Sequence, residues 1–302
     1  MAASALAQHP GMTETLTAIT RLLVLLFLVS SMSGIGLGLT LSQIIAPLRN
    51  VNLIVLAVIM NFIIVPLLSV GLARLLRLDE PFALGLLLLG LAAGAPFLPK
   101  VVGIANGDVA SAVGLMVLLM VGTTVFLPVA LPLLIKGVQV NPWKIARFLT
   151  LLMLIPLIAG LIVRACAASL SARARPVFEG LSTGILLLVL VLVMATHFQG
   201  VLRIFGTGAI FAALLFAIFS AVAGWLVGGP DLAQKTVLGL GTGLRNIPAA
   251  LVVSVQNFKD PNVSVMVLVT TLIGILILLP AARLIGRHQV GTLSESKAID
   301  SN

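Results

Sequence analysis

Two stretches decide the fold, GAPFLPK at residues 94–100 and GLGTGLRNIP at residues 239–248. Each lies near the middle of an apolar segment of membrane-spanning length. Glycine loosens a helix and proline removes a backbone donor, so we expect each segment to split into two half-helices. Freed backbone groups at membrane depth are tolerated only where they are buried in protein or line a cavity. The expected helix breakers are Pro96, Pro99, Gly241, Gly243 and Pro248.

The composition of the whole chain places it in a membrane. Apolar residues make up 60% of its 302 positions and charged residues 9%, whereas a soluble domain has about 45–50% and about 25%. A spanning helix needs about 20 mostly apolar residues. We therefore predict an all-α polytopic membrane protein with nine transmembrane helices. The nine predicted segments are 19–40, 51–76, 82–105, 109–135, 145–165, 179–198, 206–229, 233–256 and 262–285.

Outside these segments the chain has short linkers and two polar ends. We expect a polar N-terminal segment over residues 1–18 and a polar, disordered tail over residues 286–302. The transmembrane domain then covers residues 19–285, with repeat halves at about 19–135 and 145–285. Basic residues at loop ends are typical of anchoring at lipid headgroups, so we expect membrane lipid and no nucleic acid as a partner.

The two halves align without a gap when the sequence is shifted by 152 residues. The shift moves a segment by an odd number of membrane crossings, so the halves run in opposite directions. Inverted repeats of this kind characterise many secondary transporters. The first half lacks its opening helix, which explains the odd number of segments. The residues that keep register are Asp79 with Asp231, Pro96 with Pro248, Asp108 with Asp260, Gly122 with Gly274, and Pro128 with Pro280.

Lys100 and Arg245 are the cations at the two breaks. Placing either charge at the bilayer centre costs at least about 2.5–3.5 kcal/mol. No Asp or Glu lies in the interior of any of the nine segments to offset that cost, and the nearest acids in sequence, Asp108 and Asp231, lie at segment ends. A helix C-terminus favours a cation, as at Arg245, whereas a helix start, as at Lys100, disfavours one. The uncompensated lysine therefore indicates either a bound ligand or loss of the proton from its ammonium group.

We expect the two cations to lie in one pocket. Lys100 lies four residues after the shared proline and Arg245 three residues before its own. Because the two segments run antiparallel, both offsets point toward the same membrane face. An anion, or a set of helix C-terminal carbonyls, should lie beside them. The alternative is that both side chains reach the membrane surface or cap carbonyls.

Small polar residues near the breaks complete the candidate site. Any one of them alone would be interpreted as a helix–helix hydrogen bond, but together they are candidates for binding. The cationic site favours a small organic anion, a carboxylate or a sulfonate, over a neutral solute. These polar residues are Asn61, Thr123, Thr124, Thr242 and Asn246.

Four short motifs resemble the bile acid:sodium symporter family. Residues 38–41 match its G-L-T-L stretch, and residues 243–246 resemble the G-M-Q-N portion of its crossover motif. Asn61-Phe62 before Pro66 is similar to its Q-F-x-x-x-P, and Thr123-Thr124 before Pro128 to its S-T-x-x-x-P. The likeness covers about residues 20–285.

The resemblance implies a core domain beside a panel domain, with two broken helices crossing in the core. Segments one, five and six would form the panel. Members move organic anions with sodium by alternating access. The resemblance also implies a multi-pass protein of the cell membrane with a cytoplasmic C-terminus. The positive-inside rule does not decide the orientation, because basic residues divide eight against eight between the two sides.

The departures from the family concern its sodium sites. The acidic residue that the two sites share falls on Gly241, and the motif glutamine falls on Arg245. Pro99 or Lys100 replaces the asparagine of the first crossover. Fixed cations repel sodium, so we assign no cofactor and hypothesise that Lys100 and Arg245 take the places of the two sodium ions. Transport would then be sodium-independent, driven by the substrate gradient or by a proton exchanged at Lys100.

Two alternatives remain open at this stage. One is a sodium-coupled organic-anion symporter with a remodelled ion site. The other is a membrane enzyme or a receptor, but no Ser/His pair, His/Glu metal motif or acidic dyad lies within the segments to support catalysis. A single cysteine, Cys166, and three scattered histidines indicate neither a disulfide nor a metal site. We therefore predict a transporter and not an enzyme.

Overall fold

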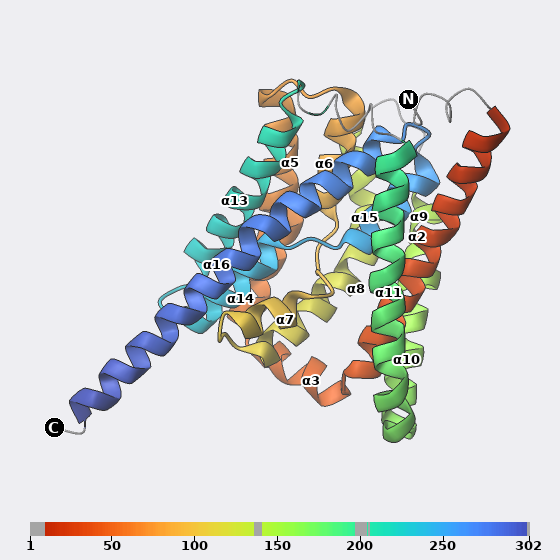
Figure 1. Ribbon diagram of the computed structural model, residues 1–302. Coiled ribbons are helices and arrows are strands. Elements are labelled where there is room, and N and C mark those ends of the chain that lie inside the picture. The colour runs from red at the N-terminus through yellow and green to blue at the C-terminus, as the bar shows by residue number, and fades with distance from the viewer. Residues whose placement is uncertain (1–9, 136–140, 197–203, 205, 301–302) are drawn as a thin grey trace.

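A computed structural model describes residues 10–135, 141–196, 204 and 206–300, and the regular structure in these residues is helical (Figure 1). The predicted all-α class is thus confirmed. A 3-10 turn covers Ala46–Arg49, and π-helical turns cover Met60–Ile64 and Thr150–Leu154. The α-helices are α2 (Pro10–Gly38), α3 (Leu41–Ile45), α4 (Val51–Ile59), α5 (Val65–Leu75), α6 (Glu80–Leu91), α7 (Leu98–Ile104), α8 (Val109–Leu134), α9 (Pro142–Leu149), α10 (Ile155–Cys166), α11 (Ala168–Thr196), α13 (Ala209–Val227), α14 (Leu232–Gly243), α15 (Ile247–Asn257) and α16 (Asn262–Asp300).

Eight helical stretches in the described part of the chain are long and apolar enough to cross a membrane. The protein is therefore a multi-pass, all-helical membrane protein, as predicted. Segment 82–105 accounts for the difference from nine, because it divides into α6 and α7, and each piece is too short to count as a span. The eight stretches are Ala18–Gly38, Val51–Leu75, Val109–Leu134, Pro142–Cys166, Ala168–Leu192, Ala209–Val227, Leu232–Asn257 and Asn262–Arg287.

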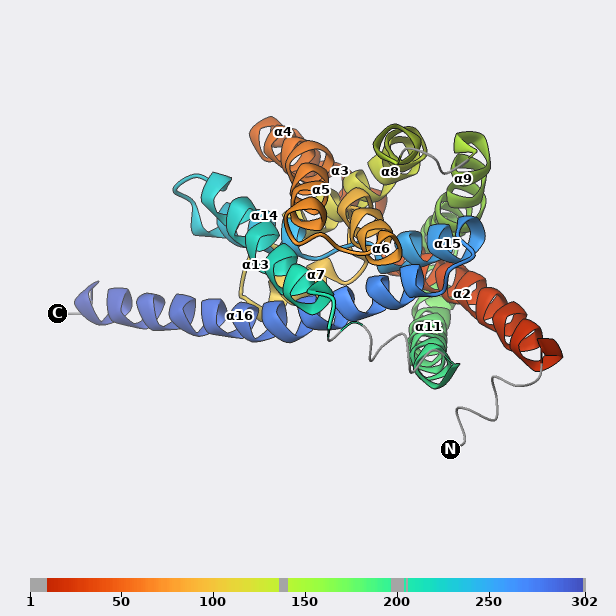
Figure 2. The same cartoon turned by 90° about the horizontal axis from the view of Figure 1, so that it is seen from above.

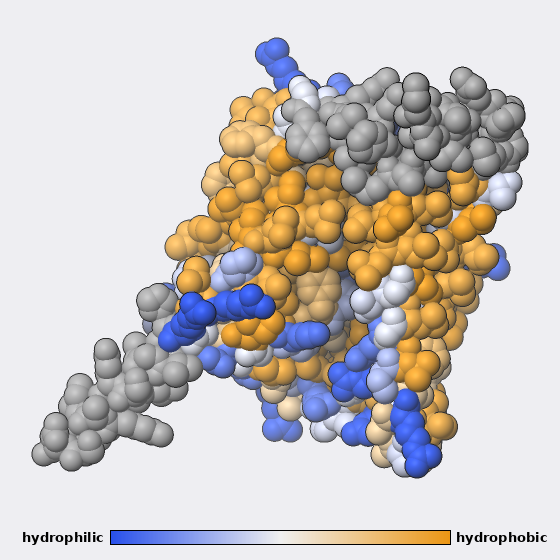
Figure 3. Space-filling model, viewed as in Figure 1, coloured by the Kyte–Doolittle hydropathy of each residue, from blue (hydrophilic) through white to orange (hydrophobic). Residues whose placement is uncertain are grey.

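The outer surface is suited to lipid. Large apolar side chains such as Leu133, Leu226 and Leu276 are more than 70% exposed. On the face shown in Figure 3, apolar residues form a broad belt, and hydrophilic residues gather toward its lower end. A surface of this kind would be unstable in water, whereas lipid tails solvate it.

The helices form two groups in space (Figure 2). Helix α2 packs against α10 and α11 on one side of the molecule. On the other side α13 packs against α14 and α16, and α6 packs against α5 and α16. Helix α15 contacts both α2 and α6, so it links the two groups. The first group contains the helices of predicted segments one, five and six.

Two boundaries differ from the sequence-based expectation. The sixth span begins at Ala168 instead of residue 179, because the helix continues through an arginine-rich stretch that the apolar pattern excludes. At the other end α16 continues to Asp300, where we expected a disordered tail. No proline follows Pro280 in α16, so nothing in that stretch removes a backbone donor.

Candidate functional site

The first helix break separates α6 from α7 over residues 92–97. Pro96 lies in this interval and Pro99 lies in the first turn of α7. Gly94 has a φ of +82°, and a Cβ atom on it would come within 2.5 Å of the backbone nitrogen of Met120. Only glycine combines that conformation with so close an approach. The break is therefore built around Gly94 as much as around the prolines.

The second break separates α14 from α15 over residues 244–246. Gly241 lies in the helical body of α14 and Gly243 is its last residue, so the break follows the glycines that we expected to form it. Pro248 lies in the first turn of α15. The backbone N–H of Asn246 donates to the carbonyl oxygen of Ala92 at 2.9 Å. The two breaks are thus joined directly by a hydrogen bond.

Arg245 is 6% exposed and lies among oxygen acceptors at the second break. Its Nε donates to the carbonyl of Leu89 at 2.8 Å, and its Nη2 donates to the carbonyl of Gly90 at 2.7 Å. Its Nη1 donates to Oδ1 of Asn61 at 2.7 Å and to the carbonyl of Thr242 at 3.2 Å. Hydrogen bonds to a charged group contribute about 1.5–3 kcal/mol each. They offset the cost of burying the charge.

Two helix C-termini converge on this guanidinium. Leu89 and Gly90 belong to the last turn of α6, and Thr242 belongs to the last turn of α14. The last carbonyls of a helix lack intrahelical donors and carry its negative end. We expected either an anion or a set of helix C-terminal carbonyls beside the cations. Arg245 has the carbonyls.

Two of the predicted polar residues, Asn61 and Thr242, join this network, and Asn246 lies beside it. Asn61 lies in the π-helical turn Met60–Ile64 and is fully buried. Its Nδ2 donates to the carbonyl of Ala57 at 3.0 Å and to Oγ1 of Thr242 at 3.4 Å. Asn246 caps α15, because its Oδ1 accepts from the backbone N–H of Ala249 at 3.1 Å. Its buried Nδ2 has no partner in the described part of the chain, so one donor is available at the second break.

The two threonines of α8 differ in what they contact. The Thr123 hydroxyl accepts from the backbone N–H of Ala93 at 2.9 Å and donates to the carbonyl of Ala93 at 3.0 Å. It therefore fixes the first break to α8. The Thr124 hydroxyl donates to the carbonyl of Met120 in its own helix at 3.2 Å. Thr124 therefore forms its hydrogen bond within α8 and not with either break.

Lys100 lies apart from the network, in a cavity of about 650 Å³ between the two helix groups. Pro96, Phe97 and Pro248 of the two breaks line one side, and α2 and α11 line the other. The lysine is exposed to the cavity. Within the described residues it forms no hydrogen bond and no ion pair. Its ammonium group is free to bind an anion.

The expectation of one shared pocket is wrong. Lys100 lines the large cavity, whereas Arg245 lines a separate cavity of about 20 Å³ with Thr270 and Gly274. Lys100 lies in α7, the second half of its broken helix, whereas the carbonyls that hold Arg245 belong to α6 and α14. The two breaks place one cation inside the protein and the other in the large cavity.

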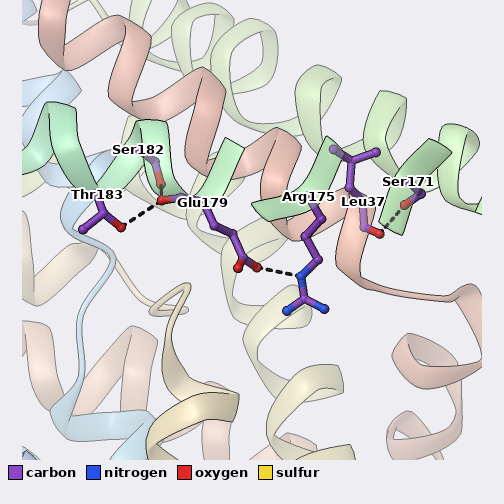
Figure 4. A network of polar contacts seen from close by, with 6 residues as sticks. All are labelled: Leu37, Ser171, Arg175, Glu179, Ser182 and Thr183. Atoms are coloured by element: carbon purple, nitrogen blue, oxygen red, sulfur yellow. Dashed lines mark hydrogen bonds and ion pairs between the residues drawn. The ribbon is translucent and has the colours of Figure 1, made fainter. Parts of the chain in front are cut away.

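The expectation of a site without an acid is also wrong. Glu179, the first residue of predicted segment 179–198, lies inside the span Ala168–Leu192 and lines the large cavity with Lys100 and Arg175. Its Oε1 accepts from Nε of Arg175 at 2.6 Å (Figure 4). The sequence signal was the i,i+4 spacing of this pair, which is that of neighbours on one helix face.

Comparisons with known proteins agree with the membrane architecture. The profile of the Sodium Bile acid symporter family matches residues 24–203, which is more than half of the chain. The probable sodium/metabolite cotransporter BASS1, chloroplastic, of Arabidopsis thaliana is 24% identical over 243 residues, covering 78% of this chain and 59% of the relative. The uncharacterized sodium-dependent transporter YocS of Bacillus subtilis (strain 168) is 30% identical over 146 residues, covering 47% of this chain and 44% of the relative.

The matched part of this chain therefore spans less than two thirds of the length of either relative. The family match includes the first break with Lys100, the π-helical turn with Asn61, and the threonines of α8. It also includes α11 with the Arg175–Glu179 pair. These matches identify a transporter family and not an enzyme family. The chain belongs to the Sodium Bile acid symporter family.

Proposed function

We propose that this protein is a secondary transporter that carries a small organic anion, a carboxylate or a sulfonate, by alternating access. One observation carries the proposal, the cavity of about 650 Å³ between two helix groups that contains a lysine without a partner among the described residues. A charge at membrane depth is expensive and is retained for function by default. An anion with an apolar body would pair with Lys100 and pack against the apolar walls.

Nine spans in two inverted repeats form part of this proposal. A shift of 152 residues places α6, Glu80–Leu91, on α14, Leu232–Gly243, from end to end. The same shift places α7 within α15 and begins α8 at the residue before α16. Asp79 and Asp231 precede α6 and α14 in the same way. The correspondence supports a pair of broken helices that cross at the hydrogen bond between Asn246 and Ala92.

The position of the cavity supports alternating access. Its lining comes from α2 and α11 on one side and from the broken helices and α8 on the other. Rocking of one group against the other would open the cavity to one membrane face and then to the opposite face. We further propose the cell membrane as the location, with a cytoplasmic C-terminus, as the family resemblance implies.

For coupling, we propose sodium symport with a remodelled ion site. The names of both relatives describe sodium-dependent carriers, which supports this version over sodium independence. Four oxygens surround the guanidinium of Arg245, which supports a fixed cation in the place of one sodium ion. Among the residues that the structure describes, Lys100 has no comparable set of oxygens. The substitution of both ions, with sodium-independent transport, therefore has weaker support than the substitution of one.

The experiment is uptake of organic anions into proteoliposomes with sodium or with choline as the external cation. We expect uptake that falls in choline and that depends on sodium concentration with a Hill coefficient near one. Equal uptake in choline would replace this version with sodium-independent transport. Absence of uptake of any carboxylate or sulfonate under both conditions would overturn the transporter itself.

A further inference from the structure

We infer that the large cavity selects anions with a single negative charge and that Glu179 sets this limit. The inference rests on the proposed anion transport and adds a substrate class to it. The relevant feature is the set of three charged side chains that line the cavity in the described part of the chain, Lys100, Arg175 and Glu179.

The charged side chains that line the cavity do not cancel one another. Glu179 neutralises Arg175 through the 2.6 Å hydrogen bond to its Nε, and Lys100 has no partner among the described residues. The three groups leave one positive charge. One carboxylate or sulfonate on an occupant would neutralise this charge, whereas a second anionic group would find no unpaired cation among the described residues that line the cavity.

The pair formed by Arg175 and Glu179 is held against α2. The guanidinium of Arg175 lies against the end of α2, where a Cβ on Gly38 would come within 2.9 Å of Cζ and Nε. The Ser171 hydroxyl donates to the carbonyl of Leu37 at 2.6 Å and holds α11 against α2 (Figure 4). The C-terminal end of α2 also favours the cation. The pair is therefore fixed to the wall of the cavity.

Stability does not explain why the pair lies there. An exposed i,i+4 ion pair contributes only a few tenths of a kcal/mol to a helix, and both side chains are about half exposed, at 50% and 52%. Charges within a membrane span are retained when they face a cavity or a substrate path. The pair faces the same cavity as Lys100, so its role is to set the charge that an occupant meets.

The rest of the cavity lining is mostly apolar. Apolar side chains such as Phe27, Ile35, Phe97 and Met116 cover most of the wall. A second anionic group on the occupant would lie either against these side chains or near the carboxylate of Glu179. The first position desolvates a charge without a partner, and the second opposes like charges. Either position of the second anionic group would therefore weaken the binding of a dianion.

The experiment measures the binding to the purified protein of matched anions that differ by one anionic group. The pairs are 2-naphthalenesulfonate with 2,6-naphthalenedisulfonate and benzoate with terephthalate. We expect each monoanion that binds to do so at least about tenfold more tightly than its dianion partner, since like charges oppose each other at short range in a partly desolvated cavity. A dianion that binds as tightly as its monoanion would overturn the inference and leave anion transport intact. Absence of binding by all four anions would overturn both.

The variant Glu179→Gln removes the charge while keeping an oxygen that can accept from Arg175. We expect it to improve dianion binding until the two members of a pair differ by less than about threefold. The double variant with Arg175→Gln removes one charge of each sign, so it should restore the preference for monoanions. Glu80→Gln is the matched control, because Glu80 is exposed at the start of α6 and does not line the cavity. If Glu179→Gln leaves the ratio unchanged, or the double variant keeps dianion binding, Glu179 does not set the limit.

Discussion

The two helix breaks contain the same kind of charge and accommodate it in opposite ways. At the second break, Arg245 donates four hydrogen bonds and is almost completely buried. At the first break, Lys100 is exposed to a large cavity and has no partner among the described residues. A cation inside a membrane protein is thus evidence for a ligand only when the protein leaves it without acceptors. Arg245 belongs to the structure, and Lys100 is available for binding.

The difference follows from where each cation lies relative to helix ends. Arg245 follows the C-terminus of α14 and lies beside the C-terminus of α6, so two negative helix ends face it. Lys100 is the third residue of α7, and the start of its own helix offers N–H groups instead of acceptors. Arginine also has a planar fork of donors that suits several fixed carbonyls, which lysine lacks.

The largest expected effect is at Arg245. The substitution Arg245→Met leaves four buried oxygens without this donor, and an unsatisfied buried group costs about 1–3 kcal/mol. We expect the free energy of unfolding to fall by at least about 3 kcal/mol. A melting temperature lower by roughly 5–10 °C in detergent would report it. The matched control is Arg164→Met, since Arg164 is only partly buried and donates one hydrogen bond of 3.5 Å.

This prediction tests the structural role assigned to Arg245. If Arg245 were instead a free ligand-binding cation like Lys100, the variant Arg245→Met would have the melting temperature of the wild type and would lose only transport. Equal melting temperatures for the two arginine variants would therefore remove the distinction between the breaks.

The second effect is expected at Lys100 and concerns binding instead of folding. Lys100→Met removes a side chain without partners, so the melting temperature of the unliganded protein should stay close to that of the wild type. A charge-assisted hydrogen bond to the anion contributes about 1.5–3 kcal/mol, and its loss should weaken anion binding at least about tenfold. Lys259→Met is the control, because Lys259 is exposed between α15 and α16. Unchanged anion affinity in Lys100→Met would show that the first break does not bind the substrate.

The smallest effect compares two adjacent threonines. Thr123→Val removes both hydrogen bonds between α8 and Ala93 at the first break, and we expect a loss of about 1–2 kcal/mol in the free energy of unfolding. Thr124→Val removes one hydrogen bond within α8, which should change stability by less than about 0.5 kcal/mol. Thermal unfolding of the two variants side by side measures the difference. Equal losses would mean that the contact with Ala93 does not hold the first break in place.

Sequence patterns predict the class of this fold better than the state of its charges. Apolar runs predict the spans, and glycine and proline predict that segments 82–105 and 233–256 are interrupted, because both features act on the local backbone. Whether Arg245 has acceptors depends on Leu89 and Gly90, more than 150 residues away in sequence. No local pattern contains that information.

Glu179 shows a second reason for an incomplete prediction. The apolar pattern placed the start of the sixth span at residue 179, although α11 begins at Ala168 and includes two arginines before this glutamate. Charges that face a cavity lower the apparent hydrophobicity of a span, so a rule based on apolar runs places the start of this span too late in the sequence. The i,i+4 spacing of Arg175 and Glu179 was the available correction.

The hydrogen bond between the two breaks has a consequence for biosynthesis. The carbonyl oxygens of Gly90 and Ala92 accept from Arg245 and Asn246, which the ribosome adds more than 150 residues later. The N-terminal half therefore enters the bilayer before its final donors exist, and its broken helix can reach its final form only when the C-terminal half has been inserted. A truncated chain that ends before α14 should accordingly be a substrate for membrane quality control and not a stable half-transporter.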